Sequence, residues 1–154
     1  MSKYYLAYGS NLNKAQMARR CPDAVPIGTG RINHYGLVFR RGVLTIEPSY
    51  DEYVPVGVWK ISKEDEKSLD RYEGVPRFYR KETVPIVLNK TDEVVDALYY
   101  VMNPGFPIDV PSMSYMWTCT QGYEDFGMDT GPLLVARANA VNAAKERDQK
   151  GGDA

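Results

Sequence analysis

The sequence predicts a mixed α+β fold, a small and partly open β-barrel with helices packed outside it. Three observations indicate this class. The β-like runs come in clusters instead of alternating strictly with helices, which argues against a doubly wound parallel sheet. Glycine and proline separate the runs at distances typical of hairpins. Six or seven such runs accompany three or four helical segments, so neither element type dominates.

The size and composition of the chain are those of one globular domain. It has 154 residues, of which 44% are apolar and 25% are charged. We expect a single domain over residues 1–145, followed by a polar, flexible tail over residues 146–154.

The first part of the chain predicts a strand, a turn and a helix. Residues 4–7 form a buried apolar run that a glycine-containing turn then breaks. Asn13 is a suitable N-cap for a helix through about Arg20, which Cys21 and Pro22 end. The β-like runs that follow cover residues 25–31, 35–40, 43–46 and 54–61.

A second helix is predicted from its caps. Ser62 is a suitable N-cap, with Asp65 at the third helical position and Ile61 available as a hydrophobic staple. Gly74 is a good residue to end this helix. Two more strands are then expected at residues 79–88 and 94–102, joined by a turn.

The last part of the chain predicts two helices after a proline-rich connector. Ser112 or Ser114 caps a helix that reaches about Phe126. A final helix runs from Pro132 to about Lys145.

Charge and hydropathy restrict the partners. The 19 basic and 20 acidic residues nearly cancel, so there is no electrostatic reason to expect nucleic acid as a partner. No stretch approaches the ~20 apolar residues that a membrane helix needs. The N-terminus lacks a signal-peptide pattern, and two cysteines are few for a small secreted scaffold. We therefore expect a cytoplasmic protein without membrane or nucleic-acid partners, either a monomer or a homodimer.

Tyrosine is unusually frequent, with 12 residues against 4 phenylalanines. Each tyrosine combines an apolar ring with a polar tip. This bias fits a half-polar cavity, but it equally fits ordinary surface and core use, and both interpretations stay open.

The first candidate site is the turn at Tyr8, Gly9, Ser10 and Asn11. A glycine turn that enters a helix presents free backbone N–H groups, which hold carboxylates, phosphates or a developing oxyanion. The pattern alone favours a plain strand-to-helix turn, in which glycine, serine and asparagine are common. The lysine of a P-loop is absent.

The second candidate is Glu73, at the C-terminal end of its predicted helix. The helix dipole disfavours a negative charge there, and partial burial would raise the pKa of the carboxyl group in the same direction. A raised pKa suits a general acid or base. Position alone favours the alternative, a solvated acid on a charged helix.

Other kinds of site have little support. The lone histidine, His34, cannot complete a zinc site with the distant Cys21 and Cys119, so we expect no metal. A hydrolytic triad or a cysteine nucleophile would need the same histidine, and no Gly-x-Ser-x-Gly elbow exists. The cysteines are interpreted as buried thiols, and the pairs Arg19-Arg20 and Arg40-Arg41 as solvated surface.

Together, the two candidate motifs resemble the γ-glutamylcyclotransferase-like family, which includes γ-glutamyl cyclotransferases, γ-glutamylamine cyclotransferases and AIG2-like proteins. The resemblance covers roughly residues 4–130. It rests on the combination of motifs, which is more specific than either motif alone. The residues that carry it are Tyr8-Gly9-Ser10-Asn11-Leu12, Val58-Trp59, Leu69-Asp70-Arg71-Tyr72-Glu73-Gly74, Phe78-Tyr79, the run 97–102, and Tyr115, Gly122 and Phe126-Gly127.

The resemblance implies a cavity formed by the glycine turn, with Glu73 facing it as the catalytic acid/base. It implies no metal and no organic cofactor. The substrate-binding residues that it implies are Leu6, Ala7, Tyr8, Gly9, Ser10, Asn11, Tyr79, Tyr100 and Tyr115.

The reaction implied by the resemblance is the release of 5-oxoproline and a free amine from a γ-glutamyl compound. The leaving amine stays open: an amino acid, a peptide, ε-lysine or another amine. Two alternatives also stay open. One is a member that binds a γ-glutamyl-like carboxylate without this reaction, and the other is a pure interaction protein.

Overall fold

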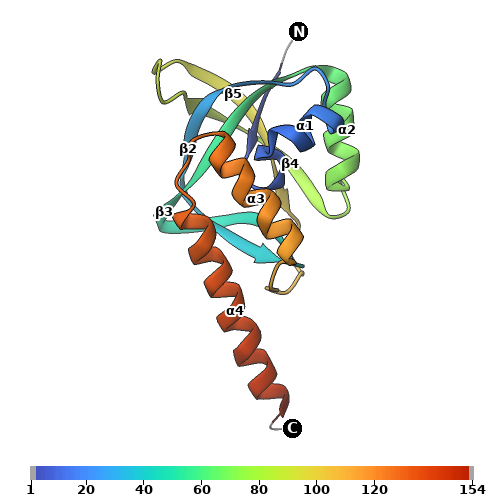
Figure 1. The fold of residues 1–154 in the computed structure, drawn as a ribbon, viewed down its shortest axis with the longest axis vertical. Coiled ribbons are helices and arrows are strands. Elements are labelled where there is room, and N and C mark those ends of the chain that lie inside the picture. Colours follow the sequence, from blue (N-terminus) through green and yellow to red (C-terminus); the bar gives the residue numbers. More distant parts are fainter. Residues whose placement is uncertain (1–2, 153–154) are drawn as a thin grey trace.

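A five-stranded mixed sheet organises the fold (Figure 1). The computed structural model describes residues 3–152. In the sheet, β1 pairs antiparallel with β3 and parallel with β5. The strands, in the spatial order β2-β3-β1-β5-β4, are β2 (Val25–Arg40), β3 (Val43–Ile61), β1 (Lys3–Ala7), β5 (Val94–Met102) and β4 (Tyr79–Val87). The predicted mixed α+β class is confirmed.

The sheet is strongly curved, but it is not closed by a ladder between its edge strands β2 and β4 in the described chain. The two edges are joined by hydrogen bonds beside Thr29. There the backbone N–H of Asn89 donates to the carbonyl of Thr29 at 2.9 Å, and the Asn89 amide donates to the Thr29 hydroxyl at 2.9 Å. This closure agrees with the partly open barrel that the sequence predicts.

The number of strands predicted from sequence was too high. The runs predicted at residues 25–31 and 35–40 form one strand, β2, and the runs at 43–46 and 54–61 form one strand, β3. Between Asn33 and Tyr35 the register with β3 shifts, and His34 has a φ of 64°. The break in the alternating pattern is therefore a bulge inside a continuous strand.

The predicted caps are confirmed. Helix α1 (Lys14–Arg20) begins at Asn13, whose side chain accepts a hydrogen bond from the backbone N–H of Gln16. Helix α2 (Lys63–Glu73) has a full capping box between Ser62 and Asp65 and ends at Gly74, which has a φ of 68°. Helix α3 (Met113–Asp125) is capped by Ser112.

The C-terminal helix α4 (Gly131–Gly152) is longer than predicted. It projects from the body of the molecule (Figure 1), and only its first half buries apolar side chains, those of Leu133, Ala136 and Ala140. The predicted end near Lys145 was wrong, because the helix continues through most of the expected tail. Flexibility of this tail stays a prediction, and residues 153 and 154 lie outside the described residues.

No helix within residues 3–152 combines the length and the apolar character that crossing a membrane requires.

Candidate active site

A cavity of about 360 Å³ opens where several segments of the chain meet. Its wall comes from β1 and the turn after it, the C-terminal end of α2, the turn between β2 and β3, the start of β4, β5 and α3. The predicted turn and the predicted glutamate therefore share one cavity. The lining residues are Tyr5, Tyr8, Gly9, Ser10, Asn11, Arg41, Val43, Leu44, Arg71, Tyr72, Glu73, Gly74, Phe78, Tyr79, Tyr100 and Tyr115.

Tyrosines make up a large part of this wall, because six of the twelve in the sequence line it. The high tyrosine content thus builds a half-polar cavity, one of the two interpretations that the sequence left open.

The turn after β1 brings backbone N–H groups to the cavity. Residues Ser10–Leu12 form a short 3-10 helix (η1) behind Gly9. Within the described chain, the N–H groups of Gly9, Ser10 and Asn11 donate to no protein acceptor. A Cβ atom on Gly9 would lie 3.2 Å from the Tyr115 hydroxyl oxygen, so glycine keeps this approach open.

Close packing on both sides holds the turn in place. A Cβ on Gly122 of α3 would lie 2.6 Å from Cβ of Leu12, and a Cβ on Gly57 of β3 would lie 2.5 Å from Cδ2 of Leu12. Both glycines thus let the turn pack directly against α3 and β3. The indole N–H of Trp59 donates to the Asn11 carbonyl at 3.0 Å. These contacts make the turn rigid.

Glu73 is the last residue of α2, and its carboxyl group is part of the cavity wall. Burial raises the pKa of Glu73 to about 7, although the positive charges of Arg20 and Arg41 act to lower it. The side chain is thus partly protonated near neutral pH, and it can both accept and donate a proton.

Asn11 connects the turn to Glu73. Its amide nitrogen donates to the Tyr5 hydroxyl at 3.0 Å and lies 3.4 Å from Oε1 of Glu73. Its amide oxygen accepts a hydrogen bond from Arg20, whose guanidinium stacks on the Tyr72 ring at 3.4 Å. Together, these contacts fix the orientation of the Asn11 amide beside the carboxyl group of Glu73.

The tyrosine hydroxyls of the wall are mostly bonded to the protein itself. Tyr8 donates to the carbonyl of Tyr100 at 2.6 Å, and Tyr79 donates to the carbonyl of Leu44 at 2.8 Å. The Tyr115 hydroxyl accepts from the backbone N–H of Leu44 at 3.0 Å. These rings are therefore held rigidly, which preorganises the cavity.

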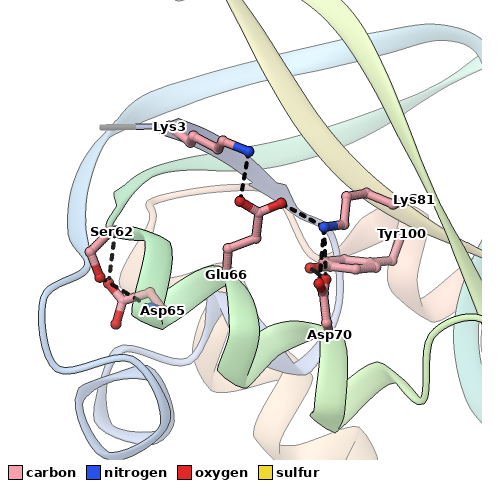
Figure 2. Close-up of polar contacts among 7 residues, drawn as sticks. All are labelled: Lys3, Ser62, Asp65, Glu66, Asp70, Lys81 and Tyr100. Atoms are coloured by element: carbon pink, nitrogen blue, oxygen red, sulfur yellow. Dashed lines mark hydrogen bonds and ion pairs between the residues drawn. The ribbon is translucent and has the colours of Figure 1, made fainter. Parts of the chain in front are cut away.

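The Tyr100 hydroxyl belongs to a second polar cluster behind the cavity, which Figure 2 shows. It donates to Asp70 at 2.6 Å, and Lys81 lies 3.0 Å from the same carboxylate. Lys81 also pairs with Glu66, which in turn pairs with Lys3 at 2.8 Å. This ionic network ties α2 to β1, β4 and β5, so it supports the helix that carries Glu73.

Most of the predicted site residues meet at the cavity: Tyr8, Gly9, Ser10, Asn11, Glu73, Tyr79, Tyr100 and Tyr115. Leu6 and Ala7 do not. They are fully buried in β1 and do not line the cavity, because strand alternation and the neighbouring strands enclose them.

Several lining residues were missed by the sequence analysis. Tyr72 lies in the family motif but was not expected at the site, and its hydroxyl lies 3.1 Å from Ser10 Oγ at the cavity. Arg41 was interpreted as solvated surface; it is exposed, but it also lines the cavity. Proximity to Glu73 in sequence was a usable signal for Tyr72. Arg41 reaches the site only through the pairing of β2 with β3.

Competing nucleophiles lie elsewhere. Cys21 and Cys119 are buried free thiols outside the cavity wall, and burial raises the pKa of each to about 12. His34 lies on the bulge of β2, where it contacts the carbonyl of Tyr50. Among residues 3–152 no cluster of three or more His, Cys, Asp or Glu side chains could hold a metal ion.

The structure is thus a small mixed α+β domain in which a carboxyl group lies beside a rigid glycine turn. Comparison with known proteins then shows the family. The model of the family "Gamma-glutamyl cyclotransferase, AIG2-like" matches residues 5–118, so the chain belongs to this family.

Individual relatives agree with the family. The chain is similar to a gamma-glutamylcyclotransferase of Bos taurus, with 28% identity over 96% of this chain and 81% of the bovine protein. A solved structure of a gamma-glutamyl cyclotransferase superposes with a TM-score of 0.77 at 25% identity, over 90% of this chain and 86% of the other. The Homo sapiens protein loc79017 gives a TM-score of 0.75 at 26% identity, over 89% and 85% of the two chains.

Proposed function

We propose that this protein is a cyclotransferase that releases 5-oxoproline from a γ-glutamyl compound. The α-amine of the γ-glutamyl group attacks the carbonyl carbon of its own γ-amide, and a five-membered lactam forms. The amide C–N bond breaks, and the former amide nitrogen leaves as a free amine. Because the nucleophile belongs to the substrate, no protein nucleophile is needed, and holding the substrate folded supplies the proximity.

Glu73 moves the protons in this proposal. Its carboxylate takes a proton from the substrate α-ammonium group, which makes the amine nucleophilic. The same carboxyl group then gives that proton to the departing nitrogen. The attacking nitrogen loses a second proton as the lactam N–H forms, and this proton leaves with the free amine as its ammonium form, so the protons balance over the cycle. A pKa of about 7 suits both steps, because neither protonation state is strongly disfavoured at neutral pH.

The turn after β1 binds the γ-glutamyl group in this proposal. The N–H groups of Gly9, Ser10 and Asn11 have no protein acceptor and are held rigidly. Such groups stabilise a carboxylate or an oxyanion without reorganising during the reaction. The Asn11 amide nitrogen, 3.4 Å from Oε1 of Glu73, holds the turn and the carboxyl group in fixed relative positions.

One observation carries the proposal. Among the described residues that line the cavity, Glu73 carries the only carboxyl group. Its pKa is raised to about 7, and it lies beside a turn whose N–H groups have no acceptor in that part of the chain. A structural role needs neither feature. The proposed chemistry uses no metal, and we assign the protein to the cytoplasm, where γ-glutamyl compounds and a reduced thiol state are expected.

The test is Glu73→Gln, measured as 5-oxoproline release from a panel of γ-glutamyl compounds. General acid–base catalysis is worth about 10²–10⁴-fold, and we expect a loss of kcat of that size with the fold retained. Glu66→Gln on the same helix is the matched control and should keep near wild-type kcat. Near wild-type turnover by the Glu73→Gln protein would contradict the proposed mechanism. Stabilisation by γ-glutamyl dipeptides without turnover by the wild type would indicate a binding protein instead.

A further inference from the structure

Tyr5 is a wall residue of the cavity that no step above uses. It lies in β1, is only 3% exposed, and was not among the site residues expected from sequence. Its hydroxyl oxygen accepts a hydrogen bond from the Asn11 amide nitrogen at 3.0 Å. Within the described chain, no protein group accepts the hydrogen of this hydroxyl in return. Tyr5 thus brings a buried hydrogen-bond donor without a protein partner to the cavity.

Arg20 determines the direction of the hydrogen bond between Asn11 and Tyr5. A guanidinium group can only donate, and that of Arg20 donates to the amide oxygen of Asn11. The amide nitrogen of Asn11 therefore faces Tyr5 and donates to its hydroxyl oxygen. A rotated Asn11 amide, which could accept the Tyr5 hydrogen, would place its own N–H groups against the guanidinium. The Tyr5 hydroxyl is consequently the acceptor, and its hydrogen stays free.

The other tyrosines of the wall differ from Tyr5 in this respect. Three of them donate their hydrogens to a carbonyl or carboxylate oxygen of the protein: Tyr8, Tyr79 and Tyr100. The Tyr72 hydroxyl is bonded to Ser10 Oγ. The Tyr115 hydroxyl also accepts, but from a backbone N–H, and it lies beside Gly9. Among the described wall residues, Tyr5 therefore combines a free hydrogen with a position at the Asn11 amide.

The hydroxyl of Tyr5 lies beside the carboxyl group of Glu73. The Asn11 amide nitrogen lies 3.0 Å from the Tyr5 oxygen and 3.4 Å from Oε1 of Glu73. Burial, followed by the negative charge of Glu73, raises the pKa of Tyr5 well above its usual value. The phenol therefore keeps its hydrogen at neutral and alkaline pH. It can donate a hydrogen bond there, but it does not act as a base.

The proposed reaction brings the reacting carbonyl group to the same place. Glu73 exchanges protons with the attacking α-amine and with the departing nitrogen. Both nitrogens are bonded to the γ-carbonyl carbon in the tetrahedral intermediate, so the oxygen on that carbon also lies beside Glu73. A fixed donor at the position where an oxyanion develops stabilises the transition state more than the ground state.

We infer that the Tyr5 hydroxyl donates a hydrogen bond to the oxyanion that forms on the γ-carbonyl oxygen. When the α-amine attacks, the C=O bond becomes a C–O single bond with a negative charge, and Tyr5 stabilises this charge. When the C–N bond to the leaving amine breaks, the C=O bond forms again. Tyr5 keeps its own proton throughout. This inference rests on the proposed function, and it adds Tyr5 as a second catalytic side chain.

The test is Tyr5→Phe, which removes one oxygen atom and keeps the ring that packs edge-on against Tyr100. The measurement is the single-turnover rate of 5-oxoproline formation at saturating substrate, which product release does not limit. Loss of one oxyanion donor costs about 10²–10³-fold, and we expect a loss of that size with KM little changed. Tyr4→Phe, one residue earlier in β1 and outside the cavity wall, is the matched control and should keep the wild-type rate.

The pH profile separates this role from a structural one. If Tyr5 only held Asn11 in place, Tyr5→Phe would shift the acid limb of kcat/KM, because Asn11 contacts Glu73. We expect the acid limb to keep its wild-type midpoint, since the environment of the carboxyl group is retained.

Three results would overturn the inference: a near wild-type rate for Tyr5→Phe, a higher KM at an unchanged rate, or a shifted acid limb. The second would mean that Tyr5 binds the ground state of the substrate. If Tyr5→Phe does not fold, Tyr5→Met, which also lacks a donor, replaces it. A wild type that releases no 5-oxoproline from any γ-glutamyl compound would contradict the proposed function itself, and the inference with it.

Discussion

Two glutamates on α2, Glu66 and Glu73, occupy opposite electrostatic environments. Burial acts to raise the pKa of Glu66, but hydrogen bonds from Lys3 and Lys81 outweigh it and lower that pKa below its usual range. Glu73 is also partly buried, but among residues 3–152 no cation contacts its carboxyl group, and its pKa rises to about 7. Cations in contact, not burial alone, decide the direction of each shift.

The difference separates a carboxylate in an ionic network from a carboxyl group that faces the cavity. Glu66 sits in the network of Figure 2 and ties the helix to the sheet as a stable anion. Glu73 ends the same helix where the dipole opposes its charge, and it faces a cavity instead of a lysine. The helix is thus anchored at its middle and carries a carboxyl group that is costly to ionise at its end.

The largest expected effect is on the pH dependence of turnover. With a pKa of about 7, only about 1% of Glu73 is ionised at pH 5, so we expect kcat/KM to fall roughly 100-fold between pH 8 and pH 5. The measurement is 5-oxoproline release across this range. Glu66→Gln should show the same acid limb. A flat profile would show that Glu73 titrates like an ordinary carboxylate.

Stability should respond in opposite directions at the two positions. Glu73 binds a proton more tightly in the folded state than in the unfolded state. Its contribution to the free energy of unfolding is therefore lost as the pH rises from its unfolded pKa of about 4.3 through its folded pKa of about 7. Glu73→Gln should therefore raise the free energy of unfolding by about 1–3 kcal/mol at pH 8. Glu66 stabilises the folded state at pH values above its unfolded pKa. This contribution to the free energy of unfolding is lost as the pH falls through the lowered pKa of the folded state. Glu66→Gln should cost about 1 kcal/mol at pH 8.

Urea unfolding at pH 8 and pH 4 measures both changes. Both differences from the wild type should shrink at pH 4, where the two glutamates are largely protonated in the unfolded chain. A destabilised Glu73→Gln protein at pH 8 would contradict the contrast between the two sites.

The smallest expected effect comes from Arg20, whose positive charge acts against burial at Glu73. Arg20→Gln should move the acid limb of kcat/KM to higher pH, because the carboxylate loses a stabilising charge. Arg20→Lys keeps the charge and should move it less. An acid limb that moves to lower pH in Arg20→Gln would mean that the hydrogen bond from Arg20 to Asn11 matters more than the charge.

Helix ends with a capping residue were the part of the fold that the sequence predicted best, whereas the uncapped end predicted near Lys145 was wrong. Asn13, Ser62 with Asp65, and Gly74 all cap the expected helices, because capping depends on groups within three or four residues along the chain. Strand boundaries were predicted less well. The bulge at His34 and the continuity of β3 depend on pairing across strands, which local pattern does not report.

The candidate site also combines features that are local in the sequence with features that depend on distant segments. The sequence pairs the glycine turn with Glu73 only through the combined family resemblance, because each motif alone favours a plain turn or a solvated acid. Both line one cavity, and their roles in a site stay a prediction. The turn's other neighbours come from distant segments. Gly57 and Gly122 make room for Leu12, and neither was assigned this role from sequence.

The sequence by itself determined the helix caps, the mixed α+β class and the two residue motifs of the site, since all of these follow from short-range chemistry. Only the tertiary structure decided that Arg41 meets the cavity and that Leu6 and Ala7 do not. It also decided the pKa shifts of Glu66 and Glu73. The reason is that burial and charge depend on which distant segments pack together. Lys3 and Lys81 reach Glu66, while no lysine in the described part of the chain contacts the carboxyl group of Glu73.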